Sequence, residues 1–183
     1  MPPTTYKINS RYILLTLFAV LFSWLIHELV HYITGVLLGY DMAMTLNTAY
    51  PVSGQYAQGW HYQVVSATGP LITIIEAIIV FALMRNGRRT TLYPFLFTCF
   101  YMRLLAAVLS IINPNDEARI SKAIGLGTFT LPLLVVALLF YLVYKTSRQY
   151  RFTKRFQLVT LVLVILFTSI IILSNQFFKV RIF

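Results

Sequence analysis

The chain contains 183 residues, of which 58% are hydrophobic and only 11% are charged. A soluble domain usually carries about 25% charged residues, because its surface must be polar. The composition excludes an ordinary soluble enzyme and a disordered chain, and the single cysteine excludes a disulfide scaffold. We therefore predict an all-α membrane protein that crosses the bilayer several times.

Five apolar runs are long enough to span a bilayer, which takes about 17–25 residues. They cover residues 12–38, 64–84, 92–112, 126–144 and 156–173. We interpret these runs as five transmembrane helices of a single integral-membrane domain, residues 1–183. The net charge is +10. Because the basic residues stand between apolar runs, we expect the lipid bilayer as their partner and no nucleic acid.

The loop charges predict the orientation of the chain. Ten basic residues fall on alternate connections: Lys7, Arg11, Arg85, Arg88, Arg89, Lys145, Arg148, Arg151, Lys154 and Arg155. The loop 39–63 has no basic residue, and the loop 113–125 balances two acidic against two basic residues. Cytoplasmic loops are rich in Lys and Arg, so we expect a cytoplasmic N-terminus, in a bacterial or archaeal cell membrane. Lys179 and Arg181, on the opposite side, disagree with this orientation.

The loop 39–63 is the only long connection between the apolar runs. Apolar residues alternate from Met42 to Leu46, and Pro51 and Gly54 follow as turn-forming residues. This pattern is typical of a short β-hairpin. We therefore predict a hairpin-like loop between the first and second membrane spans.

The motif H-E-x-x-H occurs at residues 27–31, inside the first apolar run. On a helix, His27 and His31 lie on one face, where both imidazoles can bind one Zn²⁺ ion. Glu28 is placed to act as a general base on a water molecule at the metal. A carboxylate this deep in an apolar run costs at least about 2.5–3.5 kcal/mol without compensation, which a divalent metal supplies.

A catalytic zinc site uses three protein ligands and keeps one position open. The remaining candidates near the outer membrane boundary are Asp41, His61, Asp116 and Glu117. At 1.5 Å per residue, His31 lies about 28 Å along the first run from Tyr12, close to that boundary. The run 92–112 travels outward, so Asp116 emerges at the same level. We therefore predict Asp116 as the third ligand, on the extracytoplasmic side.

Three segments carry a resemblance to the site-2 protease family of intramembrane zinc metalloproteases. They are HELVH at 27–31, Ala67-Thr68-Gly69-Pro70-Leu71, which looks like the family's A-G-P-L element, and Asn113-Pro114-Asn115-Asp116, which resembles its N-x-x-P…D-G segment. The resemblance covers residues 12–120, in the family's order. It implies an aspartate ligand, but Glu117 stands where the family has glycine. Asp116 is thus the expected ligand and Glu117 the alternative.

The resemblance also implies different roles for different segments of the chain. Residues 12–120 would form a protease-like core of three spans, and residues 126–173 would add two spans. The loop 39–63 would align an extended substrate by strand addition. Asn113 would hydrogen-bond the substrate or the developing oxyanion, or else cap the turn before Pro114.

The expected function is that of a zinc endopeptidase that hydrolyses peptide bonds in or next to transmembrane segments. Its cofactor would be Zn²⁺ and its substrate a membrane-embedded protein or peptide. Two alternatives remain. One is a non-catalytic zinc-binding membrane protein, such as a sensor, transporter or scaffold. The other is a zinc-dependent membrane hydrolase of a lipid or small amide.

Two further charged residues lie inside apolar runs. Glu76 is near the middle of the run 64–84, and Arg103 is near the middle of the run 92–112. These runs are antiparallel neighbours, so both residues are at similar depth. We predict that they form a buried ion pair that fixes the packing of the core.

Overall fold

The computed structural model describes residues 8–87, 89–178 and 181–183. These residues form the α-helices α1 (Ser10–Leu37), α2 (Gly59–Gly87), α3 (Tyr93–Leu109), α4 (Asp116–Ala123), α5 (Thr130–Tyr150) and α6 (Lys154–Phe178). A 3₁₀ turn (Thr90–Leu92) precedes α3, and the strands β1 (Met42–Met44) and β2 (Ala49–Pro51) follow α1. Five of the helices are long and apolar enough to cross a membrane. The predicted all-α membrane fold is confirmed.

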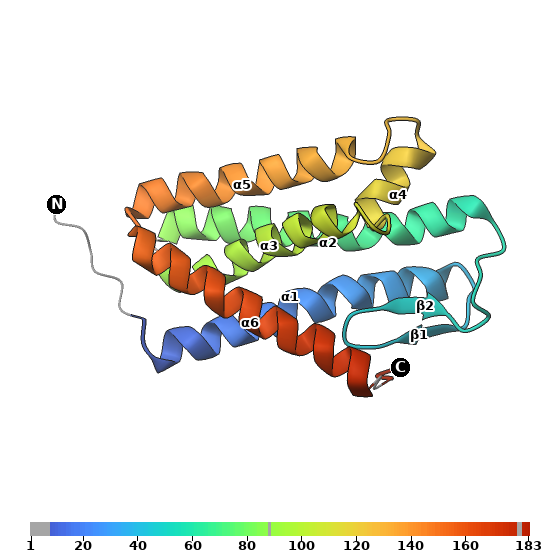
Figure 1. The fold of residues 1–183 in the computed structure, drawn as a ribbon, viewed down its shortest axis with the longest axis horizontal. Coiled ribbons are helices and arrows are strands. Elements are labelled where there is room, and N and C mark those ends of the chain that lie inside the picture. Colours follow the sequence, from blue (N-terminus) through green and yellow to red (C-terminus); the bar gives the residue numbers. More distant parts are fainter. Residues whose placement is uncertain (1–7, 88, 179–180) are drawn as a thin grey trace.

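The long helices run back and forth along one axis (Figure 1). The start of α1 lies at the end of the molecule where α2 ends and α6 begins, and the hairpin and α4 lie towards the opposite end. α6 crosses α1 at a steep angle, and the two helices are joined by a 2.6 Å hydrogen bond between the hydroxyls of Tyr12 and Thr160. Arg88 and Lys179, used in the orientation argument, lie outside the described residues, as does Lys7.

α1 begins directly after its N-cap residue, Asn9. The side chain of Asn9 accepts a hydrogen bond from the backbone N–H of Tyr12 at 3.0 Å, which satisfies one of the unpaired donors of the first turn. The helix then continues without proline or interior break to Leu37. Its regular pitch carries the H-E-x-x-H motif to the half of α1 that lies beside the hairpin.

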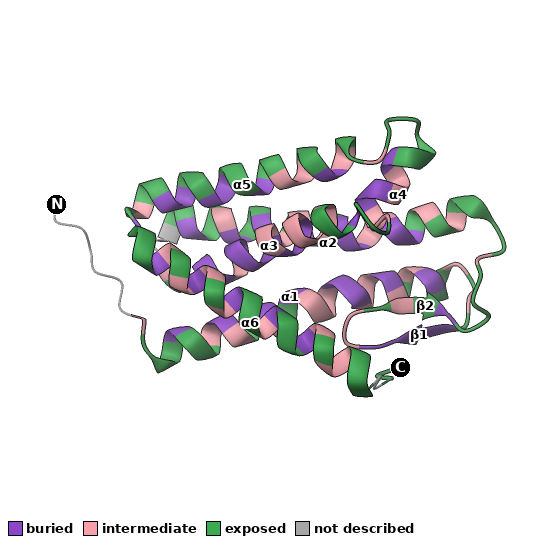
Figure 2. Cartoon of the chain, viewed as in Figure 1, coloured by how far each residue is buried: buried purple, intermediate pink, exposed green. Residues whose placement is uncertain are grey.

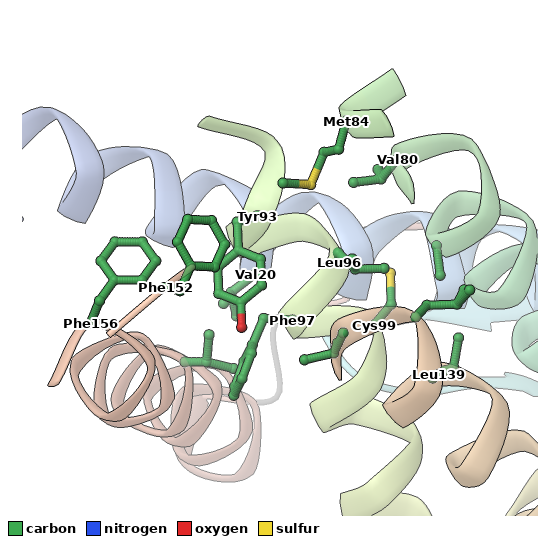
Figure 3. Close-up of a cluster of buried hydrophobic side chains, with 14 of the residues drawn as sticks. Val20, Val80, Met84, Tyr93, Leu96, Phe97, Cys99, Leu139, Phe152 and Phe156 are labelled. Carbon is green, nitrogen blue, oxygen red and sulfur yellow. The ribbon is translucent and has the colours of Figure 1, made fainter. Parts of the chain in front are cut away.

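Aromatic and aliphatic side chains from five helices pack around the start of α3. The ring of Tyr93 lies 4.5 Å from that of Phe152, which lies 4.7 Å from that of Phe156, and Leu96 and Leu139 extend the cluster (Figure 3). The outward faces of α5 and α6 stay exposed although they are apolar (Figure 2). An apolar exterior suits a chain whose solvent is lipid.

The strands pair antiparallel, with Met42 opposite Pro51 and Met44 opposite Ala49, which confirms the predicted hairpin. The turn that joins the strands lies at 45–48, where the backbone N–H of Thr45 donates to the carbonyl of Thr48 at 2.8 Å. A second turn follows at the predicted Pro51 and Gly54, where the N–H of Gly54 donates to the carbonyl of Pro51 at 2.8 Å. The last residues of the chain pair with the other edge of β1. The N–H of Met44 donates to the carbonyl of Phe183 at 3.1 Å.

α4 was not predicted, because the sequence argument searched only for apolar runs of membrane-spanning length. It is a helix of eight residues within the expected loop 113–125. Its signals are local: Asn115 at the N-cap position, two acidic residues in the first turn and Lys122 in the last. α3 ends at Leu109, before the predicted residue 112, and leaves room for the turn into α4.

Candidate metal centre

His27 and His31 lie one turn apart on α1 and are both buried. Their rings are nearly perpendicular, with centroids 4.7 Å apart, and their Nε2 atoms are 3.3 Å apart. The i, i+4 spacing thus brings two ring nitrogens to one point.

The other ring nitrogen of each histidine is tied to α2. Nδ1 of His31 is 2.6 Å from the carbonyl oxygen of Val65. A carbonyl only accepts hydrogen bonds, so this nitrogen carries the proton and Nε2 keeps its lone pair. Nδ1 of His27 is 3.2 Å from the hydroxyl of Thr73, which itself donates to the carbonyl of Gly69 at 3.0 Å. By the same reasoning, Nε2 of His27 also keeps its lone pair.

Asp116, in the first turn of α4, supplies the third donor. Its Oδ2 atom lies 3.5 Å from Nε2 of His27 and 3.4 Å from Nε2 of His31. Its other oxygen accepts a hydrogen bond from Arg119 at 3.1 Å. This ion pair with the Arg119 guanidinium favours the ionised form of the Asp116 carboxyl.

These three atoms have the separations that a small tetrahedral ion requires. Bonds of 2.0–2.1 Å at tetrahedral angles place two ligand atoms about 3.3–3.4 Å apart. The observed separations are 3.3, 3.4 and 3.5 Å. Two imidazole lone pairs and a carboxylate have no hydrogen to share among them, so a cation at their centre satisfies all three. His27, His31 and Asp116 can hold a metal ion.

Gly69 allows α2 to approach the two histidines. A Cβ atom at this position would collide with Nε2 of His31 and Cε1 of His27. The glycine is buried, and its carbonyl also accepts the Thr73 hydrogen bond that orients His27. The A-T-G-P-L segment thus packs its backbone against the two candidate metal ligands of α1.

Glu28 is buried next to the three candidate ligands without belonging to them. It is near enough to interact electrostatically with His31 and Asp116, and the backbone N–H of Ala49 in β2 interacts with its carboxylate. Glu28 and Ala49 both line a cavity beside these ligands.

A cavity of about 890 Å³ opens onto the centre. Its wall includes Glu28, both histidines, Asp116, Arg103 and residues 47–51 of the hairpin. Tyr50, Tyr56 and Tyr62 add aromatic surface. A metal ion held by these three atoms would have a coordination position open to the cavity, whereas a structural zinc site is closed by a fourth protein ligand.

The structure does not bring every predicted site residue to this centre. Glu117, the alternative ligand, is buried and pairs with Arg103, with 3.2 Å between Oε1 and Nη1. Asn113 is exposed and does not line the cavity, whereas Asn115 does. The predicted ion pair between Glu76 and Arg103 is wrong. Glu76 accepts a hydrogen bond from the Ser23 hydroxyl at 2.7 Å instead.

Three contributors to the site were missed from the sequence. They are Val65 and Thr73, which orient the histidines, and Arg103, which lines the cavity. Threonine and valine in an apolar run carry no signal of such a role. The charge of Arg103 within an apolar run was a signal, but its partner was assigned by membrane depth alone.

No family model, curated protein or solved structure matches this chain. The three segments that resemble the site-2 protease family do meet in space: α1 supplies the histidines, α2 the close-packed Gly69 and α4 the aspartate. Membership of that family stays a prediction.

The assignment of the third ligand can be tested by substitution. Asp116→Ala removes one of the three donors, so its metal content should fall as far as that of His31→Ala. Glu117→Gln should keep its metal, because Glu117 faces Arg103. Metal analysis of the purified variants gives the answer, and metal lost from Glu117→Gln but retained in Asp116→Ala would reverse the assignment.

The close approach at Gly69 can be tested with an alanine. Gly69→Ala places a methyl group against both imidazoles, so we expect metal content to fall to a small fraction of the wild-type value. Gly59→Ala is the matched control, because a Cβ atom there meets nothing within 4 Å. Equal metal content in the two variants would show that the imidazoles do not need this approach.

Proposed function

We propose that this protein is an intramembrane zinc metalloprotease, which hydrolyses peptide bonds in or next to transmembrane segments. The observation that carries the proposal is the convergence of two imidazole nitrogens and one carboxylate oxygen within 3.5 Å, inside a cavity that also contains Glu28. The resemblance of the three segments to the site-2 protease family points to the same activity.

Zinc fits the donor set better than magnesium or calcium does. Two imidazoles with one carboxylate is a donor set of catalytic zinc sites, and H-E-x-x-H is a zinc-binding motif, whereas magnesium and calcium prefer oxygen ligands throughout. The hydrogen bonds from Nδ1 to Val65 and to Thr73 resemble the outer contacts that orient histidine ligands in zinc proteins.

Bound zinc would polarise the carbonyl group to be cleaved and lower the pKa of a water molecule towards about 7. Glu28 would take the proton from the attacking water and later give it to the leaving amine. Glu28 lines the same cavity as His27, His31 and Asp116, so its carboxylate is near the place where such a water would bind.

The hairpin supports a peptide as the substrate. A transmembrane helix hides its peptide bonds in backbone hydrogen bonds, so it must unwind before water can attack one of them. Residues 47–51 line the cavity beside Glu28, so an extended segment bound there would lie along β2. The loop charges support an active site on the extracytoplasmic side of the membrane.

The Glu28→Gln variant separates an enzyme from a metal-binding protein. Glutamine keeps the size of the side chain but cannot accept the proton, so the protein should retain its zinc. Cleavage of a reporter membrane protein in proteoliposomes should fall by about 10²–10⁴-fold, which is the usual contribution of general acid–base catalysis. Glu76→Gln, which changes a carboxylate away from the centre, is the matched control and should cleave normally.

Undiminished activity of Glu28→Gln would contradict the hydrolytic mechanism. Zinc binding without cleavage by the wild-type protein would favour a sensor, transporter or scaffold. Hydrolysis of a lipid or small amide, but not of membrane proteins, would favour the alternative of a zinc-dependent membrane hydrolase with a non-peptide substrate.

A further inference from the structure

Arg103 lies in the middle of a membrane-spanning helix and yet borders the metal centre. It is on α3, only 4% of its surface is exposed, and its side chain lines the cavity. A guanidinium in a span is costly and is kept where it has partners or a role. The ion pair with Glu117 accounts for only part of its hydrogen-bonding capacity.

The contacts of Arg103 divide between two directions. Nη1 donates to Oε1 of Glu117 at 3.2 Å, whereas Nη2 lies 3.4 Å from Nε2 of His27. That separation is as short as those among the three candidate ligand atoms. Nε has no hydrogen-bond partner among the described residues. One end of the guanidinium is therefore anchored and the other borders the space where the ligands converge.

Glu117 acts as that anchor because of its place in α4. It follows Asp116 directly, so the two carboxylates leave the first helical turn in different directions, one towards the histidines and the other towards α3. The same short helix thus holds a metal ligand and the partner of the arginine, and it fixes the guanidinium relative to the centre.

We propose that Arg103 is a catalytic residue that hydrogen-bonds, through Nη2, the carbonyl oxygen of the peptide bond to be cleaved. This inference rests on the proposed function. Water oxygen bonds to the carbonyl carbon, its proton passes to Glu28, and the electron pair of the C=O bond moves onto the carbonyl oxygen. Arg103 stabilises that negative charge until the C–N bond breaks and the amine takes the proton from Glu28. Asn113, predicted for this contact, is exposed and outside the cavity.

A purely structural role for Arg103 predicts different variant behaviour. If the arginine only neutralises Glu117, removing both charges together should leave the site intact, because replacing a buried ion pair by apolar residues is often neutral or stabilising. If the arginine acts on the substrate oxygen, the same double variant should fold and bind zinc but remain deficient in peptide cleavage.

The test uses the full chain, loaded with zinc, and a phosphinic peptide, whose anionic oxygens imitate the tetrahedral intermediate. The variants are Arg103→Lys and the double variant Arg103→Met with Glu117→Leu. Lysine keeps the positive charge but has a single ammonium group in place of the planar guanidinium, so it cannot pair with Glu117 and reach the cavity at the same time. Arg85→Gln is the control, since it removes one exposed positive charge at the far end of α2.

Both variants should keep near wild-type zinc content. Their dissociation constants for the phosphinic peptide should rise by at least about tenfold, and kcat for a cleaved reporter should fall by about 10²–10³-fold, as when one oxyanion donor is removed. Arg85→Gln should match the wild type in all three measurements.

Wild-type phosphinate affinity in either variant would overturn the inference. Loss of zinc from the double variant would also overturn it, because the pair would then serve the metal site itself. These results differ from a failure of the proposed function, in which the wild-type protein itself would neither cleave the reporter nor bind the phosphinic peptide.

Discussion

The cost of placing polar groups in an apolar environment governs this structure. The side chains of the candidate metal centre have defined partners: His31 has the Val65 carbonyl, His27 has Thr73, and Asp116 has Arg119. In hydrocarbon the alternative to such contacts is an unpaired polar group, which costs several kcal/mol. The partners therefore fix the ring tautomers, and the tautomers leave two lone pairs directed at one point.

The helix α4 couples the metal centre to the rest of the fold. Its first turn contributes Asp116 to the histidines and Glu117 to Arg103, and Arg119, one turn later, reaches both Asp116 and the hydroxyl of Ser66 on α2. A helix of eight residues has little stability of its own, so packing against α2, α3 and α5 helps to hold α4 in place. α4 thereby brings Asp116 to the two histidines.

The sequence predicted those elements of the fold that show up as an apolar run of characteristic length or as a regular spacing of residues. Span length identified the five long helices, alternation identified the hairpin, and the spacing of His27 and His31 identified a shared face. The turn predicted at Pro51 and Gly54 is present at the end of β2, but the turn that joins the two strands lies at 45–48. α4 escaped prediction because only apolar runs of membrane-spanning length were sought, although its capping residue and terminal charges are local signals. The partner of Arg103 escaped prediction because it depends on how the chain folds back after α3, which neither hydropathy nor depth along a helix reveals.

X-ray absorption spectroscopy at the zinc edge, on the purified full-length protein, tests the central claim most directly. We expect about one zinc per chain, bound by two imidazoles and by oxygen at about 2.0–2.1 Å, with no sulfur. The Asp116→Ala protein should lose this signal or change its oxygen shell. A protein that binds no zinc, or binds it with sulfur or without imidazole ligands, would contradict the metal centre and the function proposed from it.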